Sequence, residues 1–128
     1  MTRIFPTHEL NRLLREAEAD GLTLGDLAVS CEKFDIAPTD LLNELSVAVA
    51  HGYLQRALSY DFCDAVMNGI IGAVVEVGMT DDMPQPAFAL YQAFDQGEWI
   101  RRYDPPETNP AEKYTRPMVD QIMRKLRS

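Results

Sequence analysis

The chain has 128 residues, of which 46% are apolar, and this is enough to build one domain with a buried core but too little for two ordinary domains. Acids outnumber bases by 20 to 12, which gives a net charge of −8. Because binding to phosphates needs a cationic surface, this charge argues against a nucleic-acid partner. No apolar run is long enough to span a bilayer, so we expect no membrane insertion.

Apolar residues recur at helical spacing through most of the chain, and turn signals divide them into separate segments. Thr7 is the expected N-cap of a first helix that ends at Gly21. The sequence Thr23-Leu24-Gly25-Asp26 fits a capping box that begins a second helix. Thr39 is the expected cap of a third helix.

The most informative segment is residues 60–78, for which Ser59 is the expected cap. Its apolar residues form two adjacent ridges, so the apolar surface is wider than a usual amphipathic stripe. Small residues at Ala65, Gly69 and Ala73 would allow a neighbouring helix to approach closely. We therefore expect this helix to form the centre of the core.

The second half of the chain contains two more predicted helices and one loop. Pro86 is expected in the first turn of a fifth helix, and Gly97 is its expected C-cap. Residues 99–108 are expected to be an irregular loop, because Pro105-Pro106 prevents a helix there. A basic, amphipathic helix is expected over residues 116–127.

No segment alternates between apolar and polar residues in the manner of a strand. We therefore predict an all-α fold, in which one domain over residues 1–128, without a linker, is a compact bundle of about six helices around the central helix at 60–78. The N-terminus turns polar at once and lacks a secretory signal, so a cytoplasmic location is expected. Cys31 and Cys63 have no metal-like spacing, and we interpret both as buried apolar residues.

Charge is distributed unevenly along the chain. Residues 57–100 contain no Lys, Arg or His but seven acids, whereas residues 113–128 carry five bases and one acid. The seven acids are Asp61, Asp64, Glu76, Asp81, Asp82, Asp95 and Glu98. The middle of the molecule is therefore expected to present a negative potential that its own bases do not neutralise.

The polar residues of the segment 60–78 fall on one narrow strip, which we call the acidic strip. On a helix of 3.6 residues per turn they occupy an arc of about 120°. They are Asp61, Asp64, Asn68, Gly72 and Glu76. The simplest interpretation is a solvated side of a core helix, neutralised by the basic helix at 116–127 packing alongside.

A second interpretation, which we adopt as the expected function, is a surface for a basic partner protein. An uncompensated acidic face raises the association rate of a cationic partner and repels acidic ones. In size, charge and helical content the chain resembles the bacterial immunity proteins that neutralise nuclease toxins, and this resemblance implies an inhibitor rather than an enzyme. The expected partner-binding residues are Asp61, Asp64, Asn68, Glu76, Asp81, Asp82, Asp95 and Glu98.

Two alternatives remain open. Asp61, Asp64, Asn68 and Glu76 have the spacing to hold Mg²⁺ in a metal-dependent phosphohydrolase, although that reaction needs cationic groups that residues 57–100 do not supply. Homo-oligomerisation is the other alternative, because the acidic body of one copy complements the basic end of another. No motif of a cofactor site or a catalytic nucleophile is present, so we expect no cofactor and no catalytic residue.

Aromatic residues and arginines alternate in one place, at Trp99, Arg101, Arg102 and Tyr103. Such a segment can anchor a partner protein or stack on nucleic-acid bases. We favour instead a loop that lies across the core and buries Trp99 and Tyr103, with its arginines paired to acids of the loop or of the acidic strip.

Overall fold

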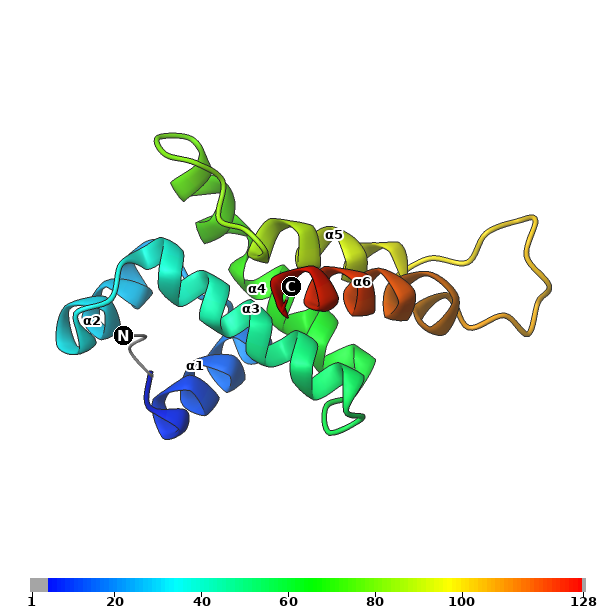
Figure 1. The fold of residues 1–128 in the computed structure, drawn as a ribbon, viewed down its shortest axis with the longest axis horizontal. Helices are drawn as coiled ribbons and strands as arrows, with labels where there is room; N and C mark the ends of the chain where they lie inside the picture. Colours follow the sequence, from blue (N-terminus) through cyan, green and yellow to red (C-terminus); the bar gives the residue numbers. More distant parts are fainter. Residues whose placement is uncertain (1–4, 128) are drawn as a thin grey trace.

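The stretches of helical periodicity fold as six α-helices in the computed structural model, which describes residues 5–127 (Figure 1). The helices are α1 (Thr7–Ala19), α2 (Leu24–Phe34), α3 (Pro38–Leu54), α4 (Tyr60–Gly78), α5 (Ala87–Gln96) and α6 (Arg116–Arg127). A short π-helix, η1 (Ala111–Thr115), leads directly into α6. The described part of the chain contains no strand, so the predicted all-α fold is confirmed.

Helix α4 lies at the centre of the bundle, as its two apolar ridges predict (Figure 1). Helices α1, α3 and α5 all pack against it, while α6 packs against α3 and α5. The buried side chains of α4 are Cys63, Val66, Met67, Ile70, Ala73, Val74 and Val77. Because each large apolar side chain stabilises the fold by about 1.5–3 kcal/mol when it is buried, α4 contributes a large share of the core stability.

Helix α1 approaches α4 most closely at Gly69, one of the small residues predicted to permit such a contact. A Cβ atom on Gly69 would lie 2.1 Å from the carbonyl oxygen of Ala17, so only glycine fits at this position. The Gly69 carbonyl also accepts a hydrogen bond of 2.9 Å from the backbone N–H of Leu22. Gly21 makes this possible, because its φ of 80° turns the chain back toward α4 directly after α1.

The helix caps agree with the sequence in two places and differ in two. The Ser59 hydroxyl accepts a hydrogen bond from the backbone N–H of Phe62, and the Thr23 capping box is fully formed. In contrast, Thr7 and Thr39 lie inside their helices and make no cap hydrogen bond. The prolines before them explain the difference: Pro6 itself occupies the cap position of α1, and Pro38 takes the first position of α3, which its fixed φ suits, so that Ala37 is the cap there.

Residues 97–109 form no regular structure and extend away from the helices, as the yellow-to-orange segment of Figure 1 shows. We call this segment the aromatic loop, after Trp99 and Tyr103. Gly97 ends α5 as predicted, whereas Pro86 lies one residue before α5 rather than in its first turn. No helix within the described range 5–127 is long and apolar enough to cross a membrane.

Candidate functional site

Packing of α4 against the end of α5 brings two acids to one amide group and two further acids near them. Asn68 donates through Nδ2 to Asp64 Oδ2 at 3.4 Å and to Glu98 Oε2 at 3.0 Å. The charges of Asp61 and Asp95 also act on Asp64. We call these five residues the acid cluster: Asp61, Asp64, Asn68, Asp95 and Glu98.

Helix geometry and one close contact together produce this arrangement. Asp61, Asp64 and Asn68 are three and four residues apart, so they share one face of α4. The end of α5 is held against that face by Tyr60, whose hydroxyl donates to the carbonyl oxygen of Phe94 at 2.6 Å. Contact is so close that a Cβ atom on Gly97 would lie 2.9 Å from the Tyr60 hydroxyl. Glu98 follows directly and is thereby placed beside α4.

The acid cluster borders an open groove of about 690 Å³. Its walls are the first turns of α4 on one side and the ends of the aromatic loop on the other. The lining residues are Ser59, Tyr60, Asp61, Asp64, Asn68, Gly97, Glu98, Asn109 and Ala111. Sequence reasoning missed Tyr60 and Asn109, since only the folded chain brings them together.

Ionisation of Asp64 is opposed by its surroundings. Partial burial, a hydrogen bond with Glu98 and the negative charges of Glu98, Asp95 and Asp61 raise the pKa of Asp64 to about 7. The pKa of Tyr91 is also raised, by burial first and then by the charges of Asp95, Glu98 and Asp64. At neutral pH Asp64 is therefore held partly protonated by burial and by the neighbouring acids.

The bases that form ion pairs in the described chain do so with acids outside the cluster. Lys113 bonds Asp104 at 2.5 Å, and Arg124 bonds Asp120 at 2.8 Å. No Lys, Arg or His among residues 5–127 forms an ion pair with the acid cluster. The interpretation in which the basic helix at 116–127 neutralises the acidic strip is therefore wrong, because α6 packs on α3 and α5 and has its counter-ions nearby.

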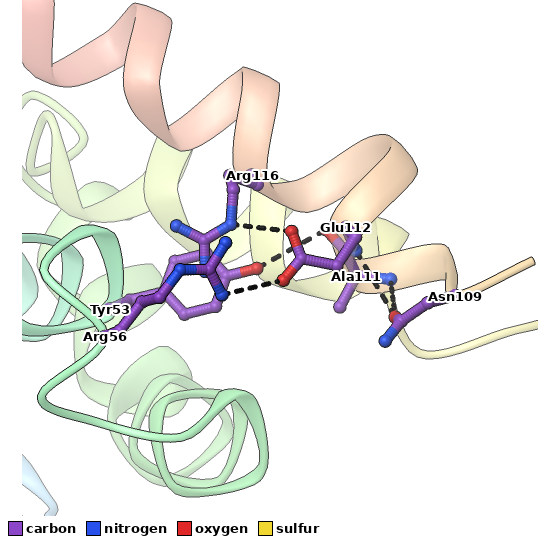
Figure 2. A network of polar contacts seen from close by, with 6 residues as sticks. All are labelled: Tyr53, Arg56, Asn109, Ala111, Glu112 and Arg116. Atoms are coloured by element: carbon purple, nitrogen blue, oxygen red, sulfur yellow. Dashed lines mark hydrogen bonds and ion pairs between the residues drawn. The ribbon is translucent and has the colours of Figure 1, made fainter.

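Figure 2 shows where two of these bases are held. Glu112 lies between two guanidinium groups and accepts from Arg116 Nε at 2.8 Å and from Arg56 Nη1 at 3.3 Å. Arg116 also lies 4.3 Å from the centre of the Tyr53 ring. This network stands beside the groove of the acid cluster and has a net charge of +1, because one carboxylate faces two guanidinium groups.

The other predicted acids do not join the cluster. Glu76 lines a second groove, of about 590 Å³, together with Glu18 and Asp20 at the end of α1. Asp81 and Asp82 are exposed in the turn that follows α4. Residues 5–127 contain no group of three or more His, Cys, Asp or Glu side chains arranged to hold a metal ion.

The aromatic loop differs from its prediction. Trp99 is 50% exposed and Tyr103 is 78% exposed, so neither ring is buried over the core. Arg101 is the buried residue instead, and it donates to the carbonyl oxygens of Gln96 and Trp99 rather than to an acid. The difference arises because a guanidinium group can bond several carbonyl oxygens at once, and this satisfies Arg101 without a carboxylate.

Arg102 is exposed, so Arg101 is the one buried residue among the four of the predicted secondary site. Among residues 5–127, the acid cluster combines converging side chains with a groove and has no ion-paired base. The chain matches no known family model, no curated protein and no solved structure.

Proposed function

We propose that the protein binds another protein by accepting a basic side chain of that partner at the acid cluster. The observation that carries this proposal is the placement of Asp64 and Glu98 on the single amide of Asn68, with no base of residues 5–127 paired to them. A Lys or Arg between the two carboxylates would replace repulsion by attraction. The partner would thus supply a counter-charge that the free protein lacks.

Inhibition of a basic protein, in the manner of the immunity proteins, is the most concrete form of this proposal. It is supported by the net charge of −8 and by the absence of bases between residues 57 and 100. We also propose a cytoplasmic location, which fits the two free thiols of Cys31 and Cys63, since paired cysteines are typical of oxidising compartments.

Association kinetics with a cationic probe test the site. The probe is a labelled peptide of about 14 residues that alternates Lys and Ser, mixed with the full chain by stopped flow at about 0.05 and about 0.5 M NaCl. Replacing Asp61→Lys together with Glu98→Lys should slow association about tenfold at the lower salt concentration and flatten its salt dependence.

A matched control separates local from overall charge. Glu32→Lys together with Asp40→Lys makes the same change in net charge at exposed positions on α2 and α3. This control should retain most of the association rate. Equal slowing in both double variants, or no slowing in the first, would show that the acid cluster is not the binding site.

The metal-dependent phosphohydrolase and the homo-oligomer are two further hypotheses, and each has its own test. A metal-dependent phosphohydrolase requires that Mg²⁺ or Mn²⁺ binds the folded chain and raises its melting temperature with metal concentration. Homo-oligomerisation requires a mass above that of one chain at low salt, measured by light scattering, which falls as salt is added.

A further inference from the structure

The aromatic loop exposes three large apolar side chains within five residues. Trp99, Ile100 and Tyr103 are 50%, 70% and 78% exposed. The other large apolar residues that are exposed in the described chain occur at most two to an element: Val29 on α2, Val75 and Met79 at the end of α4, and Met118 and Leu126 on α6. Isolated apolar residues are normal on a protein surface, whereas a group of them marks a site of interaction.

Contacts of the buried Arg101 attach this exposed loop to the rest of the protein. The guanidinium carbon of Arg101 lies 3.8 Å from the centre of the Trp99 ring and 3.6 Å from that of the Tyr114 ring. Arg101 also donates to the side-chain oxygen of Gln96 at 2.8 Å. Arg101 therefore connects the loop to both α5 and η1.

A second fastening lies farther along the loop. Asp104 accepts hydrogen bonds from Lys113 at 2.5 Å and from the Tyr114 hydroxyl at 2.6 Å. A loop that is ordered before binding loses little conformational entropy when a partner docks. The polar contacts thus stabilise a loop conformation in which Trp99, Ile100 and Tyr103 are exposed to solvent.

The loop is continuous with the acid cluster. Glu98 belongs to the cluster and precedes Trp99 directly, and both ends of the loop line the groove through Gly97 and Asn109. We infer that the aromatic loop and the acid cluster form one docking face for a protein segment in which apolar side chains stand beside Lys or Arg. This inference rests on the proposed function and adds the apolar half of the partner's chemistry.

Charge favours a protein segment over a lipid surface. Exposed aromatic and aliphatic residues also occur in loops that enter membranes, but such loops are usually assisted by bases that attract anionic lipids. The aromatic loop has one exposed base, Arg102, and two exposed acids, Glu98 and Glu107. An anionic membrane would therefore be repelled, whereas a cationic segment is attracted.

Trp99 provides a direct readout, because it is the single tryptophan of the chain. The probes are the Lys/Ser peptide and a Lys/Leu peptide of equal length and charge, with leucines on one helical face. We expect the Lys/Leu peptide to shift the Trp99 emission to shorter wavelength and to bind about tenfold more tightly than the Lys/Ser peptide.

Two variants locate the effect. Replacing Ile100→Ser together with Tyr103→Ser should remove most of the tenfold difference between the peptides. Val29→Ser, at a position on α2 that is 69% exposed, should change neither. Because all three side chains are exposed, the fold is expected to persist in each variant.

The outcomes distinguish this inference from the proposed function. If the Lys/Ser peptide does not bind at all, the acid cluster fails as a cation site and the combined face fails with it. If both peptides bind equally, only the role of the aromatic loop is overturned. A shift of Trp99 emission by phosphatidylcholine or phosphatidylglycerol vesicles, or by raising the protein concentration alone, would overturn it in favour of a lipid surface or a second copy.

Discussion

Glu9 and Asp64 are both acids that the fold removes from solvent, yet their surroundings are opposite. The Glu9 carboxylate is 8% exposed and accepts from Arg12 Nε at 2.8 Å, from Arg12 Nη2 at 2.6 Å and from the Ser30 hydroxyl at 2.7 Å. Its bond with Arg12 lowers the pKa of Glu9 to about 2, with further contributions from Ser30 and Lys33, although burial opposes the shift. Here the carboxylate charge is compensated by Arg12, and the hydrogen bond from Ser30 connects α1 to α2.

Asp64 is half-buried but has acids where Glu9 has a base. Burial and the charges of Glu98, Asp95 and Asp61 raise the pKa of Asp64 to about 7. The comparison shows that this chain compensates an acid where the acid supports the fold. An acid left without compensation in the same molecule therefore points to a role outside the fold, and binding of a cation is the simplest such role.

The largest effect is expected at the compensated acid. Glu9→Ala removes three hydrogen bonds, and it should lower the free energy of unfolding by about 2 kcal/mol in urea denaturation. The loss is below that of a deeply buried ion pair, because Arg12 is half-exposed and can return to solvent. Glu16→Gln, which removes the exposed ion pair of Arg12 with Glu16, should cost less than about 0.5 kcal/mol. Similar losses in both variants would contradict the comparison.

At the uncompensated acid Asp64, a neutral substitution should raise the free energy of unfolding rather than lower it. Asp64→Asn keeps the shape and a hydrogen-bonding group but removes the repulsion from Glu98, Asp95 and Asp61. We expect the free energy of unfolding at pH 8 to rise by about 1 kcal/mol, since water screens part of the repulsion at this half-buried site. Asp61→Asn, at an exposed position of the same cluster, should give a smaller gain. Destabilisation by Asp64→Asn would show that the carboxylate supports the fold.

The two acids also predict stability changes of opposite sign with pH. Asp64 takes up a proton near pH 7 in the folded chain but only near pH 3.8 when unfolded, so the free energy of unfolding should rise as the pH falls from 8 to 5. Because water screens the interactions of this half-buried group, we expect the rise to be no more than about 1 kcal/mol. Glu9 is protonated near pH 4.5 when unfolded but near pH 2 when folded, so its contribution is lost as the pH falls through that range.

Urea denaturation at a series of pH values checks both signs. Asp104 and Glu112, whose pKa values are lowered first by hydrogen bonds from Lys113 and Arg116, add to the loss at acid pH. In the Asp64→Asn variant the rise between pH 8 and 5 should disappear while the acid loss remains. A rise that persists in this variant would assign the proton uptake to another group.

The elements that the sequence predicts correctly are those whose signals are local. Ser59 and the apolar ridges of α4 lie within one segment, so both ends of that helix follow from the sequence alone. The caps at Thr7 and Thr39 were predicted wrongly because a preceding proline competes for the same position. Loops are harder still, since burial of Arg101 in place of Trp99 depends on Tyr114 and on backbone carbonyl groups that no spacing indicates.

The candidate site divides in the same way. Helical periodicity placed Asp61, Asp64 and Asn68 together, because all three lie on one helix. The same periodicity places Glu76 on this face of α4, where it lines a second groove together with Asn68 and the end of α1. Glu98 joins only through tertiary packing. The Glu9–Ser30 bond was missed for that reason too, because its partners are 21 residues apart.

The smallest expected effect tests whether the acid cluster lacks only a cation. Asn68→Lys, at an exposed position, would place an ammonium group beside Asp64 and Glu98 and so give the cluster what Arg12 gives Glu9. With the acid one turn before the base on α4, we expect a gain of about 0.5 kcal/mol in the free energy of unfolding at low salt. Two-dimensional NMR should show a lower pKa for the Asp64 carboxyl in this variant.

The same substitution should weaken binding while it stabilises the fold. An internal lysine competes with the lysines of the Lys/Ser peptide for the same carboxylates, so the affinity should fall about tenfold. Ala28→Lys, on the exposed face of α2, changes the net charge equally and should leave affinity nearly unchanged. A stability gain with unaltered binding would mean that the cluster is repulsive but not the docking site. Opposite changes in stability and affinity are the result that only a site built for an external cation produces.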